Sequence, residues 1–163
     1  MATAESRPSA VTIPGAVGLR VGVVRARWNE PIVERLAAGV ERAIEAHRAT
    51  SVGVTVPGAF ELPFGARALI GAGAVDAVVV IGAVIRGETT HYELVSEGCA
   101  QGVQQVQLTT GVAIGMGVLT VENDAQALAR SEGPGGHNVG EEATAAALEM
   151  AVLARVLGTS ARD

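Results

Sequence analysis

The sequence is poor in aromatic residues, cysteine and charge. Among 163 residues there are one Trp, one Tyr and two Phe, so a hydrophobic core must be built from Val, Ala, Leu and Ile. The single cysteine, Cys99, excludes an intramolecular disulfide and a cysteine-based zinc cluster, and it is typical of a reducing compartment. Charged residues make up 18% and the net charge is −5, which argues against nucleic-acid binding. These scarcities favour a cytoplasmic globular protein with no nucleic-acid partner.

The chain also lacks a long hydrophobic run. The longest apolar stretch, residues 74–85, is interrupted by Asp76 and Gly82, and it falls well short of the roughly twenty residues that a membrane span needs. Residues 1–15 are rich in Ser, Thr, Pro and Ala and carry no apolar segment of the kind a signal peptide has. We therefore expect no membrane contact, and we expect residues 1–17 to form a flexible N-terminal arm.

What the sequence does contain is apolar surface. Apolar residues make up 48% of the chain and the mean hydropathy is +0.35. This is ample for the core of one 16.5 kDa domain. The surplus of apolar residues over charge is high for a small monomer, so the composition favours a homo-oligomer that buries part of this surface between subunits.

Strand-like and helix-like patterns alternate along the chain. Short β-branched runs are each followed by apolar residues at helical spacing, and the run at 77–81 is apolar on both faces, as in a parallel strand covered by helices on each side. This order predicts an α/β domain of three layers, α/β/α, with an about four-stranded parallel sheet, right-handed crossovers and flavodoxin-like winding. The expected strands are 19–24, 51–56, 74–85 and 112–121, and the expected helices are 30–47, 62–70, 91–108, 125–130 and 143–157.

Polar residues mark three of the expected helix starts. Asn29 is a candidate N-cap of the first helix, where Pro at the next but one position does no harm. Thr90 with Glu93, and Asn123 with Gln126, have the spacing of a capping box. The sequence therefore predicts side-chain caps at these three positions.

Aromatic and ionisable side chains collect just after the expected strands. Trp28 follows the first strand, Phe60 and Glu61 follow the second, and His91 follows the third, whereas Phe64 is expected in a helix core. Ligands of open parallel sheets bind beyond the carboxyl ends of the strands, so we expect the ligand site at this edge. Taken alone, Trp28 also fits packing at a strand end, and Glu61 also fits the positive end of a helix dipole.

The segment 86–90, Arg-Gly-Glu-Thr-Thr, is the most informative. It joins a buried strand to a helix start, where backbone N–H groups, a glycine and two hydroxyls can form a cradle for an anion. His91 follows directly and can exchange a proton with whatever the cradle holds. A capping turn with an exposed histidine fits the same spacing. The glycine-rich loop 133–136 lacks the Lys-Ser/Thr ending of a P-loop, and neither His47 nor His137 has a partner at metal-ligand spacing.

Three segments resemble the lumazine synthase (6,7-dimethyl-8-ribityllumazine synthase) family. They are VPGAFELP at 56–63, GAVIRGETTHYE at 82–93 and GVLTVEN at 117–123, within a likeness that spans about 19–157. The resemblance implies the penultimate step of riboflavin biosynthesis, the condensation of 5-amino-6-(D-ribitylamino)uracil with 3,4-dihydroxy-2-butanone 4-phosphate. It proceeds by Schiff-base formation, phosphate elimination and ring closure, and it implies no cofactor and no metal.

The resemblance also implies roles for individual residues. His91 matches the proton donor and acceptor, Glu88 and Thr89 match the loop that holds the butanone phosphate, and Arg130 matches the arginine that binds its phosphate. Trp28 matches the aromatic residue that stacks on the pyrimidine. In the family, the Arg130 and Met116 positions come from the neighbouring subunit. The positions that match the pyrimidine and ribityl site are Trp28, Asn29, Ala59, Phe60, Glu61, Ala83, Val84, Ile85 and Met116.

Val139 departs from the family pattern, and so do the length and glycine content of the loop 131–139. Many members read Asn-Lys-Gly before the last helix, where this chain has Val139 in place of Lys. Either Arg130 alone suffices for the phosphate or phosphate binding is weaker.

Domain organisation and assembly follow from the same resemblance. It implies a single lumazine-synthase-like domain at 18–158, followed by a tail at 159–163. It also implies a homo-oligomer, a pentamer or an icosahedral shell, with active sites between subunits, and it leaves association with riboflavin synthase open. The alternative function is that of a paralogue that binds flavin or lumazine, or forms a shell, without catalysis.

Overall fold

The structure is a computed structural model that describes residues 12–73 and 75–158. Four strands alternate with helices, as the sequence predicts. Of the expected arm, residues 12–17 are described, and the expected tail, 159–163, lies outside the described residues. The elements are β1 (Arg20–Ala26), α1 (Glu30–Ala46), β2 (Thr50–Val56), a 3₁₀ turn (Ala59–Glu61), α2 (Leu62–Gly71), β3 (Ala77–Ile85), α3 (His91–Thr110), β4 (Ala113–Val121), α4 (Asp124–Leu128) and α5 (Val139–Val156).

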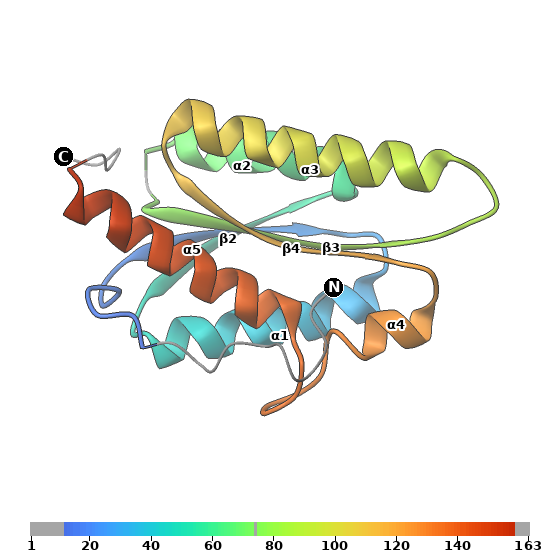
Figure 1. Ribbon diagram of the computed structural model, residues 1–163, viewed down its shortest axis with the longest axis horizontal. Coiled ribbons are helices and arrows are strands. Elements are labelled where there is room, and N and C mark those ends of the chain that lie inside the picture. The colour runs from blue at the N-terminus through green and yellow to red at the C-terminus, as the bar shows by residue number, and fades with distance from the viewer. Residues whose placement is uncertain (1–11, 74, 159–163) are drawn as a thin grey trace.

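The strands form one parallel sheet in the order β2-β1-β3-β4. β1 lies between β2 and β3, so that Val24 is paired with Val54 on one side and with Val80 on the other. Helices α2 and α3 cover one face of the sheet, and α1, α4 and α5 cover the other (Figure 1). The predicted three-layer α/β/α fold with flavodoxin-like winding is confirmed. Across the described ranges, none of the helices combines the length and apolarity that crossing a bilayer requires.

The sheet separates two cores of small aliphatic side chains. β3 contributes to both, since Val79 and Ile81 pack with α1 and α5 whereas Val78 and Val80 pack with α2 and α3. All four side chains are fully buried, which explains why the β-branched run of this strand is continuous rather than alternating. Residues 12–17 also contribute to the first core, through Ile13 and Ala16.

Two of the predicted side-chain caps are wrong. Asn29 precedes α1, but its backbone is left-handed with φ 58°, and its amide donates to the carbonyl of Ala83 (2.8 Å) instead of capping. Thr90 makes no side-chain cap on α3, and Glu93 pairs with Arg86. The partner that Asn29 finds instead is Ala83 within β3, and the partner of Glu93 is Arg86, the first residue after β3.

α5 begins at Val139, whereas the sequence pattern predicts a start at position 143. Asn138 caps the helix by accepting a hydrogen bond from the N–H of Glu141 (3.1 Å). Position 140, in the first turn of α5, requires glycine because the Cβ of any other residue would overlap a backbone carbonyl of α1. The close approach of α1 and α5 therefore places a glycine inside a helix, where the pattern indicated a loop.

Two further predictions had opposite outcomes. Asn123 caps α4 by accepting from the N–H of Gln126 (3.0 Å), as its spacing predicts. Phe64 is 79% exposed, so its placement in a helix core is wrong. α2 turns its smaller side chains toward the sheet and leaves this ring on its outer face; its buried residues are Leu62, Gly65 and Ala66.

Candidate functional site

A cavity of about 770 Å³ lies at the carboxyl ends of β1, β2 and β3. Its wall comes from the residues after β1, the turn after β2, the end of β3 and the first turn of α3, which is the sheet edge where the sequence predicts a ligand site. The residues that line it are Trp28, Asn29, Pro57, Gly58, Ala59, Phe60, Glu61, Ala83, Val84, Ile85, His91, Leu94 and Val95.

The connection after β1 is tied to both neighbouring strands. The backbone N–H of Trp28 donates to the carbonyl of Pro57 after β2 (3.2 Å), and the side chain of Asn29 donates to Ala83 in β3 (2.8 Å). The left-handed backbone of Asn29 is one that Asn adopts more readily than most residues. These bonds fix the backbone while the Trp28 ring stays 73% exposed at the cavity.

The 3₁₀ turn after β2 is seated on α3. A Cβ at Gly98 would come within 2.8 Å of the Phe60 ring, and one at Gly102 within 2.7 Å of Pro63, so the turn and the start of α2 approach α3 where it has no side chains. Phe60 remains 60% exposed. The small residues of α3 therefore let a broad apolar ring reach the cavity without being buried in the core.

His91 is the first residue of α3 and lines the cavity. Its backbone N–H is 3.3 Å from the hydroxyl of Thr89, to which it donates. Glu88 and Thr89 are exposed, lie just before the helix, and are not among the lining residues. The structure thus brings the predicted histidine to the cavity and leaves the predicted phosphate loop at its border.

Four lining residues were not among the sequence predictions. Pro57 and Gly58 belong to the motif after β2, and a Cβ at Gly58 would meet the Trp28 ring (3.5 Å). Leu94 and Val95 lie one helical turn beyond His91. Helical spacing from the histidine could have identified these two, because residues three and four apart share one face of a helix.

Like Glu88 and Thr89, two further predicted site residues do not line this cavity. Met116, in β4, is partly buried and packs against the core under α2 and α3. Arg130 follows α4, and its guanidinium donates to the carbonyl of Gln126 (3.0 Å). Next to it, the Val139 N–H donates to the Arg130 carbonyl (3.0 Å) and the Val139 side chain packs against the core. A single copy of the chain therefore does not assemble all the predicted residues around one cavity.

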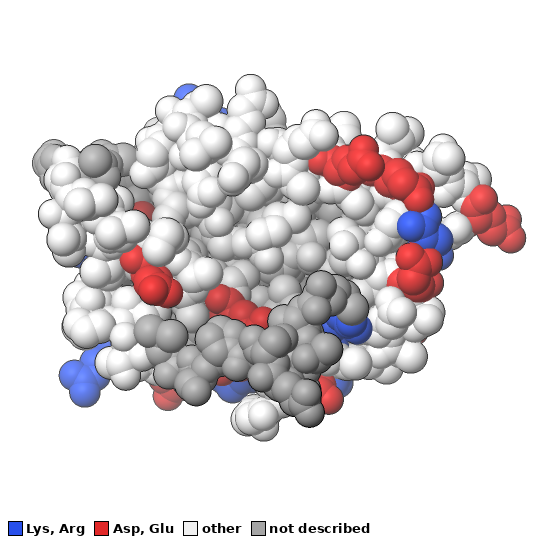
Figure 2. Space-filling model, in the orientation of Figure 1, with Lys and Arg blue, Asp and Glu red and all other residues white. Residues whose placement is uncertain are grey.

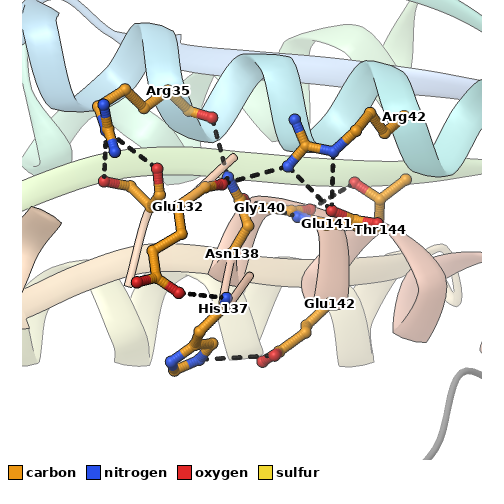
Figure 3. A network of polar contacts seen from close by, with 10 residues as sticks. Arg35, Arg42, Glu132, His137, Asn138, Gly140, Glu141, Glu142 and Thr144 are labelled. Carbon is orange, nitrogen blue, oxygen red and sulfur yellow. Dashed lines mark hydrogen bonds and ion pairs between the residues drawn. The ribbon is translucent and has the colours of Figure 1, made fainter. Parts of the chain in front are cut away.

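The loop 131–138 beside Arg130 is held by a network of polar contacts, not only by its glycines (Figure 3). Asn138 is 1% exposed, and its amide donates to the carbonyls of Arg35 (3.0 Å) and Glu132 (2.9 Å) while it caps α5. α1 receives this side chain at Gly39, where a Cβ would overlap the amide. We call this arrangement of Asn138 against Gly39 the Asn138 anchor. Sequence reasoning missed it, and the glycine in the middle of an apolar helix was the one signal.

α1 adds two arginines to the same network. Arg35 donates to the carbonyl of Ser131 (3.0 Å), and Arg42 donates to the carboxylate of Glu141 (3.0 Å) and to the carbonyl of Glu132 (3.3 Å). Both arginines come from α1 and reach the loop and the start of α5 (Figure 3). The backbone that carries Arg130 is thereby fixed to α1 on one side and α5 on the other.

The site combines a group that can transfer a proton, His91, with apolar faces. In the ranges that the structure describes, no three His, Cys, Asp or Glu side chains are grouped so as to hold a metal ion. Cys99 is fully buried in α3, and burial raises the pKa of its thiol to about 11, so the nucleophilic thiolate is scarce at neutral pH. The groups that face the cavity can stack on a ring, accept or donate a proton, and bind an anion at the start of α3.

Comparison with known proteins gives a consistent result. Residues 18–155 match the family model for 6,7-dimethyl-8-ribityllumazine synthase. The protein of that name from Kineococcus radiotolerans is 53% identical over 140 residues, which cover 85% of this chain and 86% of the relative. Its counterpart from Leifsonia xyli is 45% identical over 92% of this chain and 95% of the relative, and the one from Schizosaccharomyces pombe is 44% identical over 83% and 88%.

Proposed function

The chain belongs to the 6,7-dimethyl-8-ribityllumazine synthase family, and we propose that it condenses 5-amino-6-(D-ribitylamino)uracil with 3,4-dihydroxy-2-butanone 4-phosphate to form 6,7-dimethyl-8-ribityllumazine. Water and inorganic phosphate are released. The observation that carries the proposal is the cavity at the carboxyl edge of the sheet, which gathers Trp28, Phe60 and His91 in a chain that matches the family over 18–155.

Trp28 and Phe60 suit the flat pyrimidine. Both rings are more than half exposed although they lie at the cavity, and a heterocycle stacked on them would cover that apolar surface. We assign the rest of the pyrimidine and ribityl site to the backbone and side chains of Asn29, residues 59–61 and residues 83–85. The main contribution of these groups is to hold one substrate next to the other, because bringing two reactive molecules together removes much of the barrier.

His91 is assigned the proton transfers. The amine of the uracil attacks the carbonyl carbon of the butanone, and the nitrogen must lose a proton while the carbonyl oxygen gains protons and leaves as water. Phosphate then departs as a neighbouring carbon loses a proton, and the resulting enol becomes a ketone. The second nitrogen attacks this carbonyl carbon, and its oxygen leaves as a second water when the ring closes. An imidazole at the cavity wall can accept the first proton and return it to the departing oxygen, for which general catalysis typically contributes about 10²-fold or more.

The butanone phosphate is assigned to Glu88, Thr89 and Arg130. The first turn of α3 presents N–H groups without helical partners, which favour an anion, and Arg130 would add a positive charge. Val139 stands where many family members have a lysine, so Arg130 carries the charge on the α4–α5 side alone.

We propose that Arg130 and Met116 reach the cavity from a neighbouring subunit, so that the active protein is a homo-oligomer with sites between subunits. Neither residue lines the cavity of its own chain. Phe64 and Leu94 are 79% and 65% exposed, and covering these apolar side chains with a second copy of the chain would stabilise the assembly.

The test is to mix the purified protein with both substrates and follow lumazine by its fluorescence. We expect turnover by the native protein, a rate lower by about 100-fold for His91→Ala, and a raised KM for the butanone phosphate in Arg130→Ala. His47→Ala is the matched control, because His47 lies at the end of α1 and does not line the cavity.

The contrary outcomes are distinct. Lumazine binding without turnover would assign the chain to a non-catalytic binding role. Native mass spectrometry that detects only single chains, together with full activity, would contradict the shared site. A His91→Ala protein that assembles and reacts at the native rate would remove His91 from the proton transfers.

A further inference from the structure

Arg86, the first residue after β3, joins two elements through its side chain. Its Nε donates to the carboxylate of Glu122, just after β4 (2.8 Å), and its Nη1 pairs with Glu93 in the first turn of α3. At the end of the molecule where β3 leads into α3, Figure 2 shows basic atoms with acidic atoms on both sides. One guanidinium therefore ties the exits of two strands to the start of the helix that bears His91.

A third contact comes from the ring of Tyr92. The guanidinium carbon of Arg86 lies 4.1 Å from the centre of this ring, a stacking geometry that favours the cation. The backbone N–H of Arg86 also donates to the carbonyl of Val121 at the end of β4 (2.9 Å). We call Arg86 with Tyr92, Glu93 and Glu122 the Arg86 clamp.

The Arg86 clamp joins the two ends of residues 87–90, a segment with few other contacts. Residues 87–90 are all exposed, a Cβ at Gly87 would meet no atom within 4 Å, and Thr90 does not cap α3. Arg86 stands at one end of this segment, and Tyr92 and Glu93 stand at the other, directly after His91. Their interaction therefore fixes both ends of the connection from which the imidazole projects.

Glu93 is held on one side only. Its Oε1 pairs with Arg86, whereas its Oε2 is buried and finds no hydrogen-bond partner among the described residues. The hydrogen bond to Arg86 lowers the pKa of Glu93, and the bonds to Glu93 and Glu122 raise the pKa of Arg86, so the clamp stays charged at neutral pH.

We propose that Arg86 is a positioning residue: through Tyr92 and Glu93 it holds the start of α3 so that His91 faces the bound substrates. This rests on the proposed function. Arg86 does not line the cavity, so it acts through the histidine rather than on a substrate. Its partners are substantially exposed, at 42% for Glu93 and 55% for Glu122, and exposed ion pairs contribute little to stability.

The experiment compares R86Q, R86K, H91A and the double variant R86Q/H91A, with R155Q as control. Arg155 forms an ion pair with Asp76 (3.1 Å), just before β3 at the opposite edge of the sheet. We expect R86Q to lower kcat by about 10-fold with KM nearly unchanged, because a small misplacement of a reacting group costs rate. R86K should recover part of the loss, since a lysine can pair with one carboxylate but cannot reach both and stack on the ring.

The double variant separates positioning from any direct action. If Arg86 acts through the imidazole, R86Q makes no further difference to kcat once His91 is absent. An equal loss in both backgrounds, or native kcat in R86Q, would overturn the proposal. R155Q is expected to keep the native rate.

A second measurement does not depend on turnover. Backbone amide exchange in residues 86–94 should be faster by about 10-fold in R86Q than in the native protein or R155Q, because the segment opens locally. If the native protein forms no lumazine, the proposed function fails, but amide exchange still tests whether Arg86 holds the start of α3. Unchanged exchange in R86Q would overturn the proposed role of Arg86.

Discussion

The connection from β3 to α3 and the loop from α4 to α5 are held in opposite ways. The first depends on the Arg86 clamp, whose guanidinium side chain is 37% exposed. The second depends on the Asn138 anchor, whose side chain is 1% exposed and bonded to backbone groups of α1, α5 and its own loop. One uses ion pairs in contact with water, and the other uses a neutral amide inside the protein.

The difference means that the two attachments should contribute unequally to stability. Deleting a buried side chain that satisfies several backbone groups leaves those groups unpaired, which is costly, whereas water and salt replace much of an exposed ion pair. The α4–α5 loop is thus part of the folded framework, which suits the proposed presentation of Arg130 to a neighbouring subunit. The β3–α3 connection can be adjusted at little cost in stability, which suits a segment next to reacting groups.

The largest expected effect is on the anchor. Gly39→Ala puts a Cβ where the Asn138 amide lies, so the amide must leave its three backbone partners. We expect the free energy of unfolding to fall by about 2–4 kcal/mol in denaturant titrations, although alanine is the better helix former. Gly71→Ala in α2 is the control, because its Cβ would meet only the flexible end of Arg67 (3.3 Å); it should leave stability nearly unchanged or slightly higher.

The same pair allows a sharper test. Asn138→Ala alone should cost about 2–3 kcal/mol through the lost cap and two unpaired carbonyls. In the double variant the Cβ at position 39 occupies space that the amide has vacated. The loss of stability in the double variant should therefore be smaller than the sum of the two single losses by at least about 1 kcal/mol. Additive losses would show that the glycine and the asparagine do not interact as the structure describes.

This anchor also marks the limit of what the sequence could predict. The β-branched runs predicted the four strands, and the rule that ligands bind beyond strand ends predicted the edge where Trp28 and His91 meet at the cavity. Both patterns are local. The approach of Asn138 to Gly39 joins residues far apart in the chain, and no periodicity encodes it. Phe64 was misassigned because a helical apolar pattern does not distinguish a face that packs on the sheet from one left exposed.

An intermediate effect is expected from Val139→Lys, which restores the residue that many family members have. Val139 donates its N–H to the carbonyl of Arg130, so the new ammonium would stand beside the proposed phosphate-binding arginine. The backbone bonds of Val139 do not depend on the side chain. Its side chain packs against the core but is only partly buried, so a lysine stem can take its place while the ammonium extends to the surface, and the fold should persist. We expect the KM for the butanone phosphate to fall by about 3–10-fold with KM for the uracil unchanged, since one added phosphate contact contributes about 1 kcal/mol.

The control is Val139→Met, which keeps an apolar side chain without adding charge. A KM that falls equally in both variants would assign the gain to packing. No change in either would indicate that Arg130 alone already supplies the charge that the phosphate needs.

The smallest effect is expected from acid, which should weaken the ion pair of the Arg86 clamp but not the hydrogen bonds of the Asn138 amide. The hydrogen bond from Arg86 lowers the pKa of Glu93 below its ordinary value of 4.5, so the folded state favours the ionised carboxylate. The stabilisation is therefore present above about pH 4.5 and is lost as pH falls through the lower folded value. The stability difference between the native protein and Glu93→Gln should shrink over that range. The difference between the native protein and Asn138→Ala should stay constant, because neither an amide nor a backbone carbonyl titrates there. If acid reduced both differences alike, the contrast between a charged and a neutral attachment would not hold, and the two connections would share one global response to protonation.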